Sequence, residues 1–468
     1  MMMNQDDGRM CSMFRKGILL LMVLLLLAGQ TAVYADTEKT ITSPEDAAEL
    51  VEGILGEDPA SLDGQYRMTD QMESAVRKGG GFEGLAKSLV FLGKVKEIQT
   101  PYESEMSGMR VFRVPCVFGF LKLDLAVSVD EEGCLAGLVT LEFTGEEKKD
   151  SEADSTDTEA EETAFDTVEL AVPVSSLNGE LPGTLTVPEG DGPFPLVILV
   201  HGSGPNDRDE TIGLLKPFRD LAEGLARNGI AVYRYDKRTF VYGEELSSDI
   251  HLTLQEETID DAVMAVQVLA QQPGIDPSRI FVLGHSLGAG AVPAIDQELQ
   301  KEEIKACGYI LMAGSPRGLD VLVKEQTEYL YSLMTEVTEE QQASKDALMA
   351  DLDRLHDLDA LADTDMVMGA YKAYWEWLDG YDILQTAKQI MVPCLLLQGE
   401  EDYQVTMEDF HLWEEEIGDK DNWMLKSYPG LTHAFVPGQK EDGAAAYQKA
   451  GNVDDDVIED ITAFVKKP

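Results

Sequence analysis

From residue 166 onward, continuous apolar runs alternate with amphipathic segments of helical length, and this alternation is the strongest constraint on the fold. The run PLVILVHG is apolar up to its final His-Gly, and the amphipathic segment PFRDLAEGLARNG follows it. The run RIFVLGHS is likewise followed by LGAGAVPAIDQEL. Runs that are apolar on both faces and alternate with helices are typical of a parallel sheet covered on both sides. We therefore expect an α/β domain over residues 166–468, with its chemistry at the carboxyl ends of the strands.

The region before this domain has a different pattern. SPEDAAELVEGIL and GFEGLAKSLVFLG have helical spacing, and the segments that follow alternate apolar and polar residues as half-buried antiparallel strands do. We expect a small α+β domain over residues 36–145, in which the sequence leaves open whether Cys116 and Cys134 pair. Residues 146–163 are mostly acidic and contain no large apolar side chain. Such a segment predicts a solvated linker, here placed at residues 146–165.

The N-terminus has the features of an export signal. Arg15 and Lys16 precede an apolar run over residues 17–29, and Val33 and Ala35 fit the −3 and −1 positions of a cleavage site. The apolar run is shorter than the roughly 20 residues that span a bilayer. We therefore expect a signal peptide over residues 1–35 and an exported bacterial protein. The alternative is an uncleaved membrane anchor.

The charge balance excludes some classes of partner. Asp and Glu outnumber Lys and Arg by 87 to 37, which gives a formal net charge of −50. Such a chain is not expected to bind nucleic acid or an anionic membrane through a basic face. Contact with the membrane is expected only through the signal peptide during export. The sequence does not indicate the oligomeric state.

A candidate nucleophile lies in the middle of the α/β domain. Residues 284–288, GHSLG, match G-x-S-x-G directly after the apolar run IFVL and before a helical segment. This strand-to-helix setting is the one that the motif requires, because it exposes the serine hydroxyl at a helix N-terminus. We therefore expect Ser286 to be the nucleophile.

A serine nucleophile needs a base, and the base needs an orienting carboxylate. On this fold they follow the serine in the order acid, then histidine. His356 and His411 lie in helical segments, whereas His433 lies in a loop just after a late strand, so His433 is the expected base. Among the carboxylates of LLLQGEEDYQV, Asp402 is the expected acid, with Glu401 second.

The same chemistry needs backbone donors for an oxyanion. One is the N–H of Leu287, the residue after the nucleophile. The second is expected from the loop HGSG, residues 201–204, and is assigned to Ser203. The rival interpretation makes Ser203 itself the nucleophile, but no helix directly follows it.

Charged residues crowd the two neighbouring loops. In the stretch DRDE, residues 207–210, Arg208 is either a substrate contact or part of an ion-pair network that holds the loop. In YDKR, residues 235–238, Asp236 and Arg238 are expected to brace loops. A mostly helical stretch at about residues 317–389 separates two strands and is expected to form a cap over the site.

Together, HGSGPNDRDE, YRYDKRT, IDPSRIFVLGHSLG, LQGEEDYQV and GLTHAF resemble a family of bacterial α/β-hydrolase carboxylesterases, over most of residues 166–468. The N-terminal region resembles the small domain of unknown function that precedes this hydrolase domain in secreted members. The resemblance implies an α/β-hydrolase fold and a Ser286–Asp402–His433 esterase. One departure is RTFVYGEE, where many relatives have a glycine-rich RGxGxS, and this leaves the shape of that loop open.

The expected function is an exported serine carboxylesterase that acts on a small-molecule ester through an acyl-enzyme on Ser286. No metal or organic cofactor is implied. The alternatives are a serine peptidase or acyl transferase with the same triad, and a non-catalytic binding or cell-surface protein.

Overall fold

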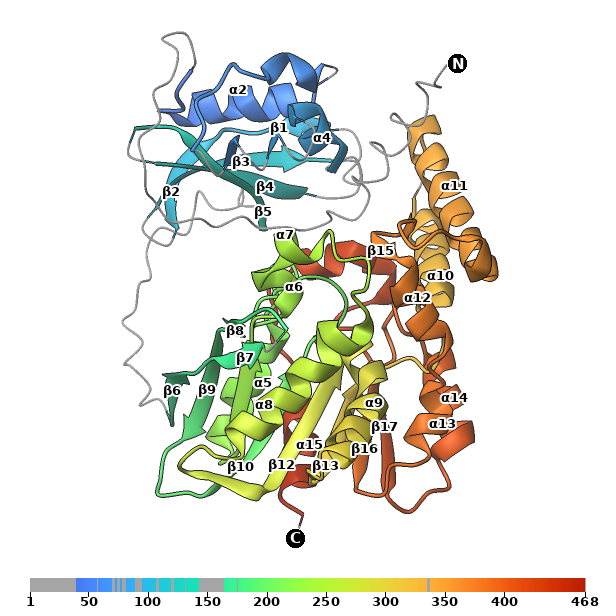
Figure 1. Cartoon of the computed structure of the whole chain (residues 1–468). Coiled ribbons are helices and arrows are strands. Elements are labelled where there is room, and N and C mark those ends of the chain that lie inside the picture. The colour runs from blue at the N-terminus through green and yellow to red at the C-terminus, as the bar shows by residue number, and fades with distance from the viewer. Residues whose placement is uncertain are drawn as a thin grey trace. The chain divides into compact units, whose positions relative to one another are not determined.

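The computed structural model describes residues 39–467, except for residues 57, 70–71, 74–75, 78–80, 89–94, 107–108, 119–121, 131, 143–163, 175 and 335–336. The predicted signal peptide and almost all of the predicted linker lie outside the described residues. Within the described part of the chain, no helix is both long and apolar enough to cross a membrane. The chain divides into two compact units, Met1–Thr156 with Glu339–Gln341, and Asp157–Thr338 with Gln342–Pro468 (Figure 1).

The first unit is a sheet with helices packed on it. Its helical elements are α2 (Pro44–Ile54), η1 (Pro59–Leu62) and α4 (Gly81–Ser88). Its strands are β1 (Glu97–Ile98), β2 (Tyr102–Met106), β3 (Met109–Val117), β4 (Lys122–Val129) and β5 (Leu135–Glu142), all paired antiparallel. Helix α2 begins at a capping box formed by Ser43 and Asp46. Helices and antiparallel strands occur where the sequence predicted them, and residues 89–93 of the second predicted helix lie outside the described residues.

The two cysteines among the described residues of this unit are free thiols. Cys116 and Cys134 are both buried and neither forms a disulfide. Burial raises the pKa of Cys116 to about 12 and, aided by the Asp130 carboxylate, that of Cys134 to about 11. Both side chains therefore stay protonated at neutral pH and pack as small hydrophobes.

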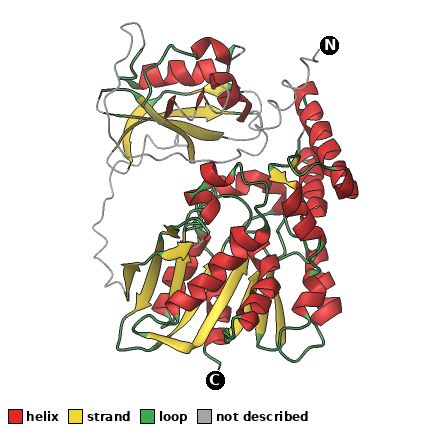
Figure 2. Cartoon of the chain, in the orientation of Figure 1, coloured by secondary structure: helices red, strands yellow, loops and turns green. Residues whose placement is uncertain are grey.

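The second unit contains an eight-stranded sheet (Figure 2). Six strands run parallel: β10 (Phe194–Val200), β11 (Ala231–Tyr235), β12 (Ile275–His285), β13 (Gly308–Met312), β16 (Cys394–Gly399) and β17 (Trp423–Tyr428). β6 (Phe165–Glu169) and β9 (Gly183–Pro188) add an antiparallel pair at one edge. A two-stranded ribbon, β7 (Val172–Val174) and β8 (Gly179–Leu181), lies between them in sequence. The order is β17-β16-β13-β12-β10-β11-β9-β6, so β12 lies near the middle.

Burial on both faces explains the continuous apolar runs. In β10, Leu196, Ile198 and Val200 belong to one hydrophobic cluster, and Val197 and Leu199 belong to another on the opposite face. All five are fully buried. A strand covered on both sides has no solvent face, so its sequence does not alternate with polar residues.

Helices cover each face of the sheet. One face carries α8 (Asp260–Leu269), α9 (Leu287–Lys301) and α14 (Met407–Ile417), and the other carries α5 (Pro217–Arg227) and α15 (Asp455–Val465). A π-helical turn, η4 (Gln255–Ile259), precedes α8, and η6 (Lys440–Gln448) precedes α15. The segment that departs from RGxGxS forms two short helices, α6 (Arg238–Val241) and α7 (Gly243–Leu246).

The stretch between β13 and β16 is mostly helical, as predicted. It contains α10 (Leu319–Ser332), α11 (Glu339–Asp353), η5 (Arg354–Ala360), α12 (Lys372–Asp379) and α13 (Ile383–Ala387). A small hairpin, β14 (Met366–Val367) with β15 (Ala370–Tyr371), was not foreseen. Helix α10 contacts the loop after β16, because the side-chain amide of Gln326 donates to the Gln404 carbonyl at 3.0 Å and Tyr329 stacks on Tyr403.

Candidate active site

All five residues predicted for the site lie at one edge of the large sheet. Ser203 follows β10, Ser286 and Leu287 follow β12, Asp402 follows β16, and His433 follows β17. Because these four strands are parallel, their carboxyl ends meet at the same edge.

The serine is held on a sharp turn between β12 and α9. Ser286 has φ 55° and ψ −118°, a backbone conformation that residues with a side chain rarely adopt. The two glycines of the motif make this turn possible. A Cβ at Gly284 would lie 2.3 Å from the Gly288 carbonyl oxygen, and one at Gly288 would lie 2.3 Å from that of Val200. Leu287 is the first residue of α9, where a backbone N–H has no acceptor within the helix.

The expected acid and base are in direct contact. The Nδ1 atom of His433 donates to Oδ2 of Asp402 at 2.6 Å, and both residues are about 3 % exposed. Oδ1 of Asp402 accepts the backbone N–H groups of Gln404 and Val405 at 2.7 and 3.0 Å. These bonds leave the carboxylate with a fixed orientation and the imidazole with a proton on Nδ1.

Glycine again permits the close approach of two loops. A Cβ at Gly399 would lie 2.4 Å from the carbonyl oxygen of Leu431, in the loop that carries His433. Gln398 was not anticipated as part of the site. Its buried amide donates to Oδ2 of Asp402 at 3.1 Å and to the Val405 carbonyl at 2.8 Å. A single polar residue inside the run CLLLQG was the available signal.

The competing candidates lie elsewhere. Glu401 accepts the N–H of Lys440 at 3.3 Å, and Glu400 accepts the hydroxyl of Ser427 at 2.8 Å. The side chains of His356 and His411 are 76 % and 65 % exposed. Of these groups, none is brought to the Asp402–His433 pair by a contact among the described residues.

The loop after β10 lies directly against the nucleophile. A Cβ at Gly202 would lie 3.1 Å from Cβ of Ser286. The N–H of Gly202 donates to Oε1 of Glu210 at 2.6 Å, and its carbonyl accepts from Nζ of Lys237 at 2.8 Å. Ser203, the next residue, is exposed. Neither Glu210 nor Lys237 was predicted to serve this loop, although both lie in the quoted charged stretches.

His285 joins three parts of the site. Its Nε2 donates to the backbone carbonyl of His433 at 2.9 Å, and its Nδ1 lies 2.9 Å from Oε2 of Glu210. Burial favours the neutral imidazole, but Glu210, the His433 carbonyl and Asp402 together raise the pKa of His285. Burial likewise opposes ionisation of Glu210, whereas His285 and the Gly202 N–H lower its pKa. Between the two ordinary values, from pH 4.5 to 6.5, these directions favour an imidazolium paired with a carboxylate.

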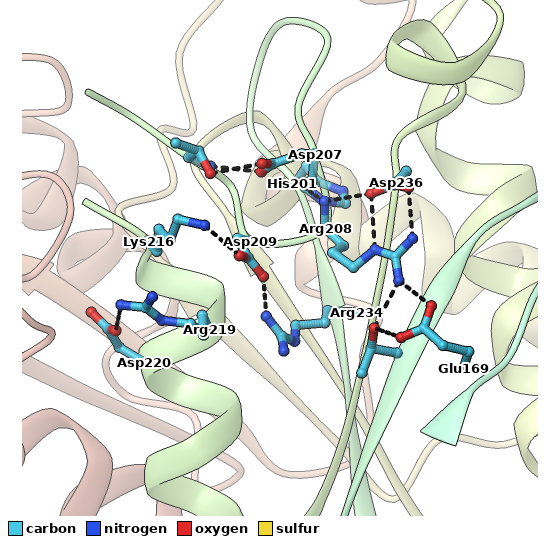
Figure 3. Close-up of polar contacts among 12 residues, drawn as sticks. Glu169, His201, Asp207, Arg208, Asp209, Lys216, Arg219, Asp220, Arg234 and Asp236 are labelled. Atoms are coloured by element: carbon cyan, nitrogen blue, oxygen red, sulfur yellow. Dashed lines mark hydrogen bonds and ion pairs between the residues drawn. The ribbon is translucent and has the colours of Figure 1, made fainter. Parts of the chain in front are cut away.

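A network of ion pairs holds the outer part of the loop (Figure 3). Arg208 donates to both carboxylate oxygens of Asp236, at 3.1 and 2.9 Å, and to Glu169 at 2.6 Å. Asp209 accepts from Lys216 at 2.9 Å and from Arg234. Of the two interpretations of Arg208, the ion-pair network is confirmed, and Asp236 braces the loop as expected.

A buried histidine, His201, also contacts the backbone of this loop. Its ring is 1 % exposed, and Nε2 lies 3.0 Å from the Asp207 carbonyl. Burial lowers the pKa of His201 to about 4, so at neutral pH the ring is uncharged and donates to this carbonyl.

We expect Glu210→Gln to destabilise the protein by about 3 kcal/mol between pH 4.5 and 6.5, because it leaves the buried imidazolium without its counter-charge. The lowered pKa of Glu210 contributes stability above 4.5, which is lost as the pH falls through the folded value. The raised pKa of His285 contributes stability below 6.5, which is lost as the pH rises through the folded value. The difference between wild type and variant should therefore shrink on either side of this window, as measured by urea unfolding at a series of pH values.

A matched control is available on the surface. His411 and Glu414 form an exposed pair at 3.4 Å, so Glu414→Gln should change stability little at any pH. A Glu210→Gln effect that is constant from pH 4 to pH 9 would contradict the charged state assigned to the buried pair.

The strand order, the serine on a strand-to-helix turn and the buried carboxylate–imidazole pair after β16 and β17 define an α/β-hydrolase of the serine type. The model of the family described as serine aminopeptidase, S33, matches residues 193–439. The chain belongs to this family.

Individual relatives are esterases by name. Esterase EstD of Thermotoga maritima is 36% identical over 375 residues, which cover 80% of this chain and 82% of the relative. Among solved structures, an esterase of Pyrococcus furiosus is 16% identical, with a TM-score of 0.41 over 65% of this chain and 91% of that chain. Est1E from Butyrivibrio proteoclasticus is also 16% identical, with a TM-score of 0.39 over 64% of this chain and 96% of that chain.

Proposed function

We propose that this protein is an exported carboxylesterase that hydrolyses small-molecule esters through an acyl-enzyme on Ser286. The observation that carries the proposal is the buried 2.6 Å contact between His433 and Asp402, at the sheet edge where Ser286 occupies its strained turn. The 36% identity to an esterase supports an ester substrate.

In the proposed mechanism, Ser286 attacks the ester carbonyl while Nε2 of His433 takes the hydroxyl proton. Asp402 keeps the proton of the imidazole on Nδ1 and stabilises the imidazolium that forms. The N–H groups of Leu287 and Ser203 stabilise the oxyanion. His433 then gives its proton to the leaving alcohol, and a water molecule, activated by His433 in turn, releases the acid from Ser286.

Peptide hydrolysis is the second candidate. It rests on the description of the matched family, serine aminopeptidase, because the same residues serve both reactions. A peptidase that removes N-terminal residues needs a group that binds the substrate's ammonium, and the geometry described above assigns no such group.

A substrate panel separates the two candidates. Purified protein should hydrolyse p-nitrophenyl esters of short acyl chains and react with a fluorophosphonate at Ser286, identified by mass spectrometry of the tryptic peptide. Turnover of aminoacyl p-nitroanilides above that of the esters would favour the peptidase. No labelling at Ser286 in folded protein would sink both proposals and favour a non-catalytic binding protein.

Export is the other part of the proposal and rests on the N-terminal sequence. Expression of the full-length chain in a bacterial host should yield protein outside the cytoplasm that begins at Asp36, as read by N-terminal sequencing. A product that keeps residues 1–35 and sediments with membranes would instead indicate an uncleaved anchor.

A further inference from the structure

A buried lysine donates a hydrogen bond to the Gly202–Ser203 peptide, which carries one of the proposed oxyanion donors. Nζ of Lys237 donates to the carbonyl oxygen of Gly202 at 2.8 Å, and Lys237 is only 2 % exposed. Lys237 follows β11, the parallel neighbour of β10, so its ammonium group can reach the loop that follows β10.

This contact, together with the longer one that Nδ2 of Asn206 makes to the same carbonyl at 3.2 Å, orients the Gly202–Ser203 peptide. The Gly202–Ser203 peptide is planar and trans, so its carbonyl oxygen and its amide hydrogen point in opposite directions. The oxygen points to the buried Lys237, whereas Ser203 is exposed. The N–H of Ser203 therefore points away from the buried Lys237 side chain. The nearby positive charge also polarises the peptide and makes the N–H a stronger donor.

Lys237 is paired with a carboxylate, which in turn accepts a hydrogen bond from a phenol. Oε1 of Glu257 lies 2.7 Å from Nζ of Lys237, and Oε2 of Glu257 accepts the hydroxyl of Tyr374 at 2.6 Å. Both residues are less than 10 % exposed. Glu257 lies on the π-helical turn η4, a conformation that recurs at functional sites.

The chain of contacts begins in the mostly helical segment between β13 and β16, here called the helical insertion. Tyr374 belongs to α12, the helix that follows the β14–β15 hairpin between β13 and β16. Burial, with the adjacent Glu257 carboxylate, raises the pKa of Tyr374 well above its usual value, so the phenol remains a donor. Tyr374, Glu257, Lys237 and Gly202 thus form a continuous buried chain from the insertion to the oxyanion loop.

We propose that Lys237 is the positioning residue of the oxyanion hole, and that Glu257 and Tyr374 couple its placement to the helical insertion. The inference rests on the proposed function, because it assigns a role within the same reaction. Lys237 acts through the Ser203 N–H and does not touch the substrate.

The main test is Lys237→Met, which keeps the length of the side chain and removes the donor. Because the oxyanion forms only in the transition state, kcat for p-nitrophenyl acetate should fall about 10- to 100-fold with KM nearly unchanged. The affinity for a trifluoromethyl ketone, whose adduct with Ser286 places an oxyanion in the same hole, should fall by the same factor. The pH profile of kcat/KM should keep its shape, since the Asp402–His433 pair is untouched.

The neighbouring Arg238 provides a matched control. It donates to both carboxylate oxygens of Asp261, at 2.7 and 2.6 Å, and the pair is as buried as Lys237. Arg238→Met therefore breaks a buried ion pair in the same segment and should lower the melting temperature without the loss of kcat. An equal loss of kcat in both variants would overturn the specific role of Lys237.

The coupling to the insertion is tested by a double-mutant cycle. Tyr374→Phe leaves the Lys237–Glu257 pair in place and should lower kcat only about threefold. In the Lys237→Met background the same change should have no further effect, because it acts through Lys237. Independent, multiplying losses would overturn the coupling.

Two further measurements keep the outcome decisive. If the single variant Lys237→Met does not fold, the double variant Lys237→Met/Glu257→Gln is used instead. It removes both buried charges and should show the same loss of kcat. If the wild type is active and the Lys237 variant has the same kcat, this inference is overturned and the proposed function stands. Absence of Ser286-dependent turnover in the wild type would overturn the proposed function, and this inference with it.

Discussion

Replacing Ser286 with alanine should lower kcat for ester hydrolysis by about 10⁵- to 10⁶-fold, since a serine hydrolase without its nucleophile retains only what binding and the oxyanion donors supply. The fold should survive, because alanine at position 286, on the turn between β12 and α9, keeps the Cβ that this turn already accommodates at φ 55°. Equal far-ultraviolet circular dichroism and an unchanged melting temperature would show this. Fluorophosphonate labelling should be lost together with turnover.

Ser278 serves as a control in the same strand. It lies in β12, is exposed, and its hydroxyl donates locally, to Asp276. Ser278→Ala should keep full activity and full labelling. If Ser286→Ala kept its activity and the label appeared on Ser203 instead, the nucleophile would have to be reassigned to Ser203.

The candidate nucleophile was predicted from a signal that is local in the sequence. Ser286 was proposed because a strand, a G-x-S-x-G turn and a helix follow one another within about 20 residues. The two glycines carry this signal for a steric reason, since a Cβ at either one would collide with a carbonyl oxygen. Asp402 and His433 followed from the chain order on this fold and from their positions after strands.

The residues that were missed act across the fold. Glu210 meets His285, Lys237 meets Glu257, and Glu257 meets Tyr374, which is 117 residues away in sequence. No spacing rule relates such pairs, because their contact depends on how β10, β11, η4 and α12 pack. The charges of Glu210 and Lys237 were visible inside the quoted stretches, but the direction of each side chain was not.

His285 illustrates the same limit. The motif places it beside the nucleophile, where a histidine is easily taken for the catalytic base. In the structure its ring is 3 % exposed and its two nitrogen atoms contact Glu210 and the His433 carbonyl. It therefore ties together the oxyanion loop, the elbow and the loop of His433, which only the tertiary structure could show.

Asp402→Asn should lower kcat by about 10⁴-fold while leaving the backbone of the site in place. The reason lies in the donors that surround Asp402. Oδ1 accepts two backbone N–H groups, from Gln404 and Val405, so the amide oxygen of asparagine must occupy that position. The NH₂ group then faces Nδ1 of His433 and the donating amide of Gln398.

This arrangement inverts the hydrogen bond that orients the base. Nδ1 of His433 must accept from the new NH₂ group, so the proton of the neutral imidazole moves to Nε2. An imidazole protonated at Nε2 has no lone pair there for the proton of Ser286, and the general-base step fails. The loss should therefore appear in kcat, and the rate of fluorophosphonate labelling should fall with it, while KM changes little.

Glu401→Gln is the matched control, since it makes the same carboxylate-to-amide change one residue earlier. In the described part of the loop, the Glu401 side chain accepts a long hydrogen bond from the Lys440 N–H at 3.3 Å, so this variant should keep activity within about twofold. Circular dichroism at the assay temperature shows whether Asp402→Asn is folded, because the amide leaves a donor facing Gln398. Near-normal turnover in folded Asp402→Asn, with a large loss in Glu401→Gln, would transfer the role of the acid to Glu401.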